Sequence, residues 1–158
     1  MMNEERGVPM KEKTKLILAI AAAGVVLLAV AMIFFPKPLT EKLELTDTAD
    51  IANGVMFSAT PDGEDSLPMT IAEDDLQRLA EEIAADKVRY AGRFSVVSYD
   101  APVYYLMLTT DTAHLPTFAV DCEGYLYING DNVGGNRYRI SSGRLYALLA
   151  ELHYTAQE

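Results

Sequence analysis

The stretch LILAIAAAGVVLLAVAMIFFP, residues 16–36, contains twenty consecutive residues without a charge and ends in a proline. An α-helix rises about 1.5 Å per residue, so twenty residues span roughly 30 Å, the thickness of the hydrocarbon core of a bilayer. Apolar side chains would occupy every face of such a helix, and the rest of the chain is too short to enclose it. The sequence therefore predicts a transmembrane helix over residues 16–35.

A cleaved signal peptide is the alternative explanation of this segment. Ala29, Val30 and Ala31 form a small-x-small cleavage pattern, and the lysines that precede the segment would supply a basic leader. The apolar run continues past this pattern to Phe35 before Pro36 ends the helix. We therefore expect a retained anchor, with cleavage as the open alternative.

Basic residues near the two ends of the segment predict its orientation in the cell membrane. Four precede the segment, and two, Lys37 and Lys42, follow it soon after. Because lysine and arginine are enriched on the cytoplasmic side of single spans, residues 1–15 are expected to be a short cytoplasmic tail. Residues 36–42 then form a proline-containing linker, and residues 43–158 form an extracytoplasmic domain.

The charge of the outer part of the chain excludes one class of partner. Residues 36–158 contain nine basic and twenty acidic residues, a net charge of −11. Such a domain repels phosphate backbones, so no nucleic-acid partner is expected, and the charge favours solubility. The single cysteine, Cys122, cannot form an intramolecular disulfide, and we expect its side chain to be buried in a sheet.

The outer domain is expected to have an α+β fold. Short segments rich in β-branched and aromatic residues, separated by turn residues, predict an antiparallel sheet of four to six strands. The segments concerned are 42–46, 55–60, 88–99, 103–109, 117–122, 125–129 and 137–140. Two helices, at 71–85 and from Ser141 to near Tyr154, are expected to cover one face and leave the other free.

The start of the first of these helices has a recognisable capping pattern. Thr70 and Glu73 match a capping box, and acidic residues suit the positive end of the helix dipole. Adjacent acids on successive helix positions point in different directions, so Glu73, Asp74 and Asp75 are not expected to hold a metal ion.

Catalytic and metal-binding patterns are lacking. Neither His114 nor His153 has another histidine or a cysteine at metal-ligand spacing, and a nucleophilic pair of Cys122 with His114 has no further support. The loop from Asp131 to Asn136 fits neither a calcium loop nor a phosphate cradle. We predict no metal, no cofactor and no catalytic residue, and retain Asp131, Asn132 and Asn136 as a candidate ligand loop.

A candidate interaction surface lies on the last strands. Tyr125 and Tyr127 alternate with apolar residues and so share one sheet face, and Arg137 and Arg139 alternate in the same way. Tyrosine and arginine are enriched where proteins bind one another, although tyrosine also suits a half-buried sheet.

Three functions follow from these expectations. The first is a non-catalytic interaction module, tethered through residues 16–35, whose open sheet face binds a protein or a component of the cell envelope. The second is an accessory structural subunit of a membrane complex, in which the anchor directs assembly. The third, a membrane-proximal enzyme, lacks a set of converging catalytic groups in the sequence.

Overall fold

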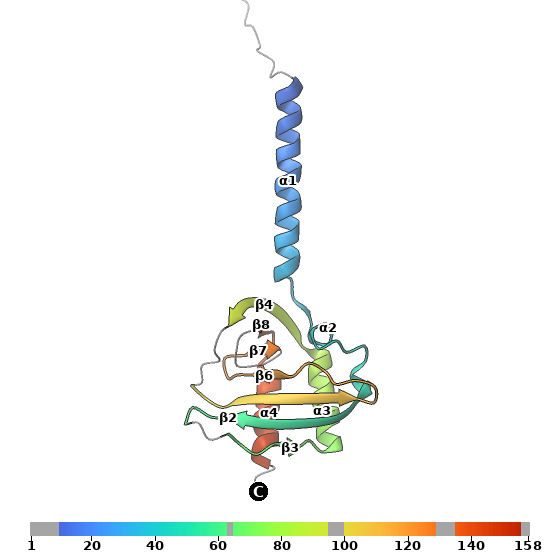
Figure 1. Cartoon of the computed structure of the whole chain (residues 1–158), viewed down its shortest axis with the longest axis vertical. Helices are drawn as coiled ribbons and strands as arrows, with labels where there is room; N and C mark the ends of the chain where they lie inside the picture. Colours follow the sequence, from blue (N-terminus) through green and yellow to red (C-terminus); the bar gives the residue numbers. More distant parts are fainter. Residues whose placement is uncertain (1–9, 63–64, 95–99, 129–134, 156–158) are drawn as a thin grey trace, which may run out of the picture. The chain divides into compact units, whose positions relative to one another are not determined.

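The computed structural model describes residues 10–62, 65–94, 100–128 and 135–155 (Figure 1). The chain divides into two compact units, Met1–Phe35 and Pro36–Glu158. The boundary falls immediately before Pro36, where the apolar segment ends.

The first unit contains the helix α1 (Met10–Phe34). Within it, Lys13–Phe34 is long and apolar enough to cross a membrane, as judged by length and composition. A signal sequence near the start of a chain meets the same criterion. The predicted N-terminal apolar helix is therefore present, as one candidate membrane span among the described residues.

The second unit has the predicted α+β architecture, with a single antiparallel sheet that is larger than expected. Its strands follow the order β1-β4-β8-β7-β6-β5-β2-β3. The strands are β1 (Lys37–Pro38), β2 (Ile51–Ala59), β3 (Met69–Thr70), β4 (Lys87–Phe94), β5 (Val103–Thr110), β6 (Phe118–Val120), β7 (Tyr125–Ile128) and β8 (Gly135–Ile140). The prediction of four to six strands was too low because the two edge strands, β1 and β3, contain two residues each, too few to produce an alternating pattern.

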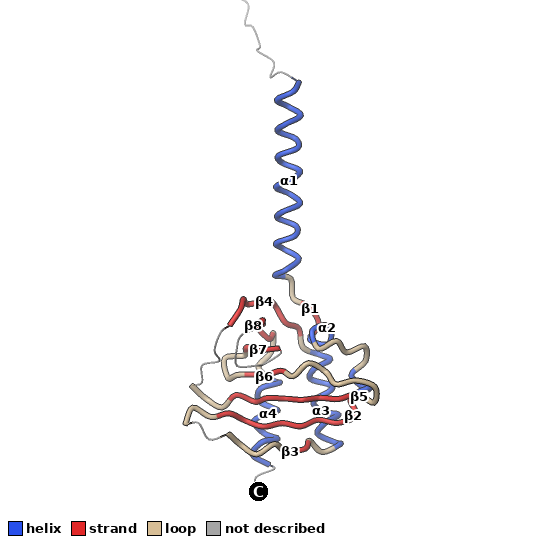
Figure 2. The backbone as a smooth tube through the Cα atoms, viewed as in Figure 1, coloured by secondary structure: helices blue, strands red, loops and turns tan. Residues whose placement is uncertain are grey.

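Two long helices, α3 (Glu73–Ala85) and α4 (Arg144–Thr155), lie behind one face of this sheet (Figure 2). The apolar stripe of α4 consists of four buried leucines, and α3 buries three apolar residues. Fully buried side chains from the sheet, such as Leu106, Phe118 and Leu126, meet these helices in the main core. Burial of this apolar surface is the principal force that holds the two layers together.

The start of α3 differs from the capping-box prediction. The helix begins at Glu73, its N-cap residue is Ala72, and no side chain caps it. Thr70 instead belongs to β3 and pairs with Val55 of β2. Pairing with β2 holds the backbone of Thr70 extended, so the helix starts two residues later than predicted, with the three acids still in its first turn.

The segment predicted as a linker, residues 36–42, is part of the folded unit. Lys37–Pro38 pairs with β4, and the following residues form the short helix α2 (Leu39–Lys42). Leu39 and Leu43 are completely buried in the main core. The strand predicted at 42–46 is therefore absent, because the chain there ends α2 and turns.

Gly54 has a packing role inside a strand. The dipeptide Asn53-Gly54 lies inside β2 and makes no tight turn. A Cβ atom on Gly54 would lie 3.0 Å from side-chain carbons of Leu108 and Leu76. The glycine therefore permits close packing of β2 under α3.

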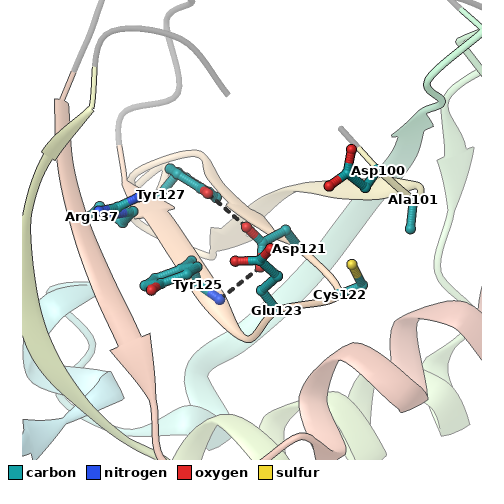
Figure 3. Close-up of a pocket in the computed structure, with 8 residues that line it drawn as sticks. All are labelled: Asp100, Ala101, Asp121, Cys122, Glu123, Tyr125, Tyr127 and Arg137. Atoms are coloured by element: carbon teal, nitrogen blue, oxygen red, sulfur yellow. Dashed lines mark hydrogen bonds between the residues drawn. The ribbon is translucent and has the colours of Figure 1, made fainter. Parts of the chain in front are cut away.

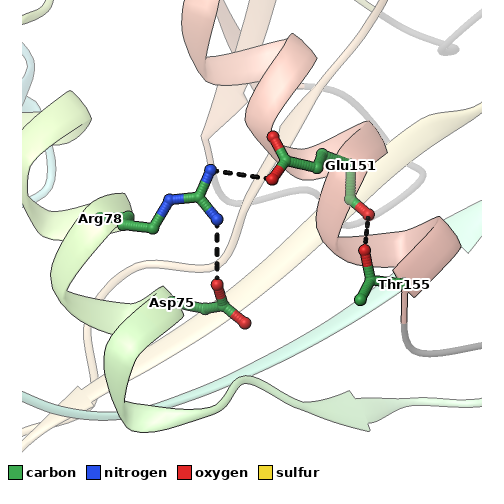
Figure 4. A network of polar contacts seen from close by, with 4 residues as sticks. All are labelled: Asp75, Arg78, Glu151 and Thr155. Atoms are coloured by element: carbon green, nitrogen blue, oxygen red, sulfur yellow. Dashed lines mark hydrogen bonds and ion pairs between the residues drawn. The ribbon is translucent and has the colours of Figure 1, made fainter.

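An exposed polar network joins the two long helices (Figure 4). Arg78 of α3 donates to Asp75 at 3.1 Å and to Glu151 of α4 at 2.9 Å. Exposed ion pairs contribute little to stability, so this network positions side chains more than it holds the fold.

Burial of Leu39 gives a test of the fold. We expect Leu39→Ala to lower the free energy of unfolding by about 2–5 kcal/mol, because it leaves a cavity in the main core. Chemical denaturation of the full-length chain in detergent measures this change. Leu67→Ala is the matched control, since that leucine is 88% exposed. Equal effects of the two substitutions would mean that residues 36–42 form a simple linker.

Candidate functional site

The face of the sheet that points away from the helices contains a second, smaller apolar cluster. This face was expected to be free, but six of its side chains are buried: Ala59, Phe94, Val103, Tyr105, Ala119 and Tyr127. Phe57 stacks on Tyr105 with ring centroids 4.8 Å apart, and Phe94 meets Tyr127 edge to face at the same distance. Aromatic packing therefore stiffens this face, which we call the second face.

The four residues of the predicted interaction surface come together on this second face. Strand β7 alternates as predicted, with its two tyrosines on the second face and Leu126 and Ile128 in the main core. Cross-strand pairing places Arg139 opposite Tyr125 and Arg137 opposite Tyr127. Residues paired in this way have side chains on the same face, so register alone assembles the cluster.

Tyr125 is held between two arginines. The guanidinium carbon of Arg137 lies 4.5 Å from the centroid of the Tyr125 ring, and that of Arg139 lies 4.8 Å from it. Both distances are within the range of a cation–π interaction. The stacked arrangement keeps an aromatic ring and two positive charges in fixed positions on a half-buried surface.

Tyr127, in contrast, is buried beneath this surface. Its side chain is only 4% exposed, and its hydroxyl donates a hydrogen bond of 2.6 Å to Oδ2 of Asp121. Oδ1 of the same carboxylate accepts from the backbone N–H of Tyr125 at 2.8 Å. Burial and then the hydrogen bond to Asp121 raise the pKa of Tyr127. Tyr127 therefore fixes the β6–β7 turn and offers little surface to a partner.

A hollow of about 140 Å³ opens beside these residues (Figure 3). Asp100, Glu123 and Cys122 line it together with the tyrosines and Arg137. The Nε atom of Arg137 is buried and has no hydrogen-bond partner among the described residues. Cys122 is exposed in the turn between β6 and β7, which corrects the expectation that it is buried in a strand. The turn places the thiol outside the ladder of β6.

The candidate ligand loop does not join this cluster as far as the structure describes it. Asp131 and Asn132 lie outside the described residues. Asn136 is an exposed residue of β8 paired with Ile128 of β7, a residue of the main core, and so faces away from Arg137. It lines a separate hollow of about 380 Å³ with Lys42 and Tyr138.

A serine–histidine contact is a feature that sequence analysis did not find. Ser58 Oγ lies 3.0 Å from His153 Nε2, across a separation of 95 residues along the chain. Ser58 is only 1% exposed, so a substrate cannot reach its hydroxyl, and the contact acts as a structural hydrogen bond between β2 and α4. Burial lowers the pKa of His153 and raises that of the adjacent Tyr104 to about 12.

The pairing of Cys122 with His114 is excluded by the sheet. Cys122 follows Val120, which pairs with Tyr104 near the start of β5, whereas His114 bridges Thr109 near the end of that strand. Five residues of extended chain separate these positions, about 17 Å. Among the described residues, no group of three or more histidine, cysteine, aspartate or glutamate side chains is arranged to hold a metal ion.

Comparison with known proteins finds no match to a family model, to a curated protein or to a solved structure.

The bond between Tyr127 and Asp121 predicts a stability effect. Tyr127→Phe keeps the ring contacts but leaves a carboxylate oxygen of the buried Asp121 without its donor, and we expect a loss of about 1–3 kcal/mol. Chemical denaturation of the detergent-solubilised chain measures it. Tyr125→Phe, which removes a hydroxyl from the same strand without touching Asp121, should have little effect. A similar loss in both variants would contradict this account.

The contact between Ser58 and His153 predicts a pH dependence of stability. Because burial lowers the pKa of His153 in the folded state, the unfolded chain binds the proton more readily. Stability from this residue is therefore present above the unfolded pKa of about 6.5 and falls as the pH drops below it toward the folded pKa. The denaturation midpoint should fall as the pH is lowered through this range, and His114→Gln should leave that dependence unchanged because His114 is exposed. His153→Gln should make the dependence weaker. Unchanged slopes in both variants would refute the assignment.

Proposed function

We propose that this chain is a single-pass protein of the cell membrane whose outer α+β unit is a non-catalytic interaction module. In this proposal α1 is a retained anchor with its N-terminus in the cytoplasm, and the unit Pro36–Glu158 lies outside. The observation that carries the proposal is the second face, where Tyr125 lies between Arg137 and Arg139.

The composition of α1 and its flanks supports the anchoring part of the proposal. From Leu16 to Phe34 the helix has large apolar side chains, and they are exposed. Basic residues are more numerous before the span than soon after it. Only Phe35 and Pro36 separate the last residue of α1 from the first residue of β1, so the chain allows the unit at most about 10 Å of reach from the end of the helix.

The chemistry of the second face supports the interaction part. Aromatic and arginine side chains are enriched among the residues that contribute most to binding. The stack around Tyr125 is already ordered by its neighbours, so little conformational entropy remains to be lost when a partner binds. The buried Tyr127 and Asp121 hold this surface in place. A hydrolytic function has less support, because the serine of the serine–histidine contact in the described residues is buried.

Anchoring and sidedness are tested on the full-length chain in its membrane. We expect the protein to remain in the membrane pellet after alkaline carbonate washing, to be released by detergent, and to keep its apolar segment intact by mass spectrometry. Protease added to spheroplasts should digest the outer unit. Recovery of a shortened chain in the aqueous fraction would show that the segment is a cleaved signal peptide and would refute the anchor.

The binding role of the second face is tested by photocrosslinking in intact membranes. A photoreactive residue in place of Tyr125 should give specific adducts, whereas one in place of Gln77 on the exposed side of α3 should not. Adducts at neither position, or equally at both, would contradict an interaction surface at Tyr125. Exchange of residues 16–35 for polyleucine separates this role from assembly through the anchor, since a tethered module keeps its adducts after the exchange.

A further inference from the structure

The basic residues of the outer unit differ in whether an acid neutralises them. Lys37, Arg78 and Arg144 each form an ion pair, at N–O distances between 2.6 and 3.3 Å. Four others lie on the second face of β4 and β8: Lys87, Arg89, Arg137 and Arg139. Within the described parts of the chain, no carboxylate pairs with any of these four, which we call the basic face. An acidic unit therefore has four basic side chains without an ion pair on one face, although Glu123 lines hollows with Arg137 and Arg139.

The register of the two strands makes the basic face unfavourable in isolation. Arg89 of β4 is directly opposite Arg139 of β8. Lys87 and Arg137 lie two residues away on the same face, and neither strand contains an acidic residue. Like charges directly opposite one another in a sheet are destabilising. An anionic ligand on this face would relieve the repulsion.

The position of the basic face in the sheet points to the source of the anion. Strand β1 pairs with β4, and Pro36, which precedes β1, is where the chain leaves this unit toward α1. Neighbouring strands are about 4.8 Å apart, so β4 and β8 lie roughly 5 and 10 Å from the strand attached to the anchor. In the sheet order, β4 is next to β1, and β8 is next to β4.

An anionic bilayer is a better partner for the basic face than a soluble polyanion. A soluble polyanion must approach a unit whose net charge is −11, and repulsion slows that approach. The anchor keeps the unit beside the lipid headgroups, so their effective concentration at the unit is high. When the basic face turns toward the membrane, the three acids in the first turn of α3 lie on the other side of the sheet. Tyr125, between two arginines, suits the interface, where tyrosine is enriched.

We propose that Lys87, Arg89, Arg137 and Arg139 bind anionic phospholipid headgroups of the bilayer that contains α1, and so dock the outer unit on the membrane. This inference rests on the proposed function, since it requires α1 to be embedded, and it names the partner of the second face. Each basic residue near an anionic surface strengthens association about fivefold, and the effect declines with ionic strength.

The single cysteine of the chain makes docking measurable in the full-length protein. Cys122 is exposed in the β6–β7 turn, and the hollow that it lines with Arg139 adjoins the basic face. The chain, labelled there with a fluorophore, is reconstituted into vesicles of phosphatidylcholine alone or mixed with phosphatidylglycerol, each containing a spin-labelled headgroup as quencher. We expect stronger quenching in the anionic vesicles at low ionic strength, and weaker quenching at high ionic strength.

Substitutions identify the residues responsible. R89Q and R139Q should each reduce the docking equilibrium in anionic vesicles about fivefold. The denaturation midpoint of R89Q should stay the same or rise, because this variant removes a cross-strand repulsion, so a folding defect does not explain its loss of docking. R139Q also loses its contact with the Tyr125 ring, so R89Q is the variant that separates docking from stability. R78Q is the matched control, since Arg78 is ion-paired on α3, and it should leave quenching unchanged.

The possible outcomes distinguish this inference from the proposed function. Equal quenching in both lipid compositions, or equal loss in R78Q, would overturn lipid docking. If that result came with protein adducts at Tyr125, the second face would bind a protein, and the module would stand without its lipid partner. If the chain failed to float with the vesicles, the anchor itself would be refuted.

Discussion

Pairing of β4 with β8 is the constraint on which the second face depends. Up to Tyr90, alternate residues of β4 face the helices, and an unbroken strand would also direct Phe94 toward them. A bulge between Tyr90 and Gly92, with a positive φ of 109° at the glycine, shifts the register by one residue. Phe94 thereby moves to the second face and packs on Tyr127. Arg89, before the bulge, remains opposite Arg139.

The two sides of the sheet contribute in different ways. The helix side contains most of the buried apolar area and therefore supplies most of the stability. The second side is smaller and combines aromatic contacts with one buried carboxylate, Asp121, whose two oxygens accept from Tyr127 and from the backbone of Tyr125. Such satisfied buried polar groups specify geometry more than they add stability. They hold the arginine-flanked ring of Tyr125 in a defined place.

Errors in the sequence-based prediction occurred where tertiary contacts override local patterns. A capping box at Thr70 is locally consistent, yet the strand β2 binds that residue first. Pro36 and Pro38 suggested a linker, although burial of Leu39 incorporates the segment into the fold. The two-residue edge strands contain too few residues for any periodic pattern. In each case the deciding partner is distant in the sequence, so no local window contains the information.

The sequence by itself determined the apolar N-terminal helix and the α+β class. It also determined the apolar stripes of the two long helices and the alternation of Tyr125 with Leu126. Each of these features depends on composition or on a repeat along one element. The sequence also indicated that tyrosine and arginine share a face. Only the tertiary structure decided that Tyr127 is buried on Asp121 and that Arg89 lies opposite Arg139. Both facts follow from strand register, which is set by packing of the whole sheet on its helices and cannot be read from either strand alone.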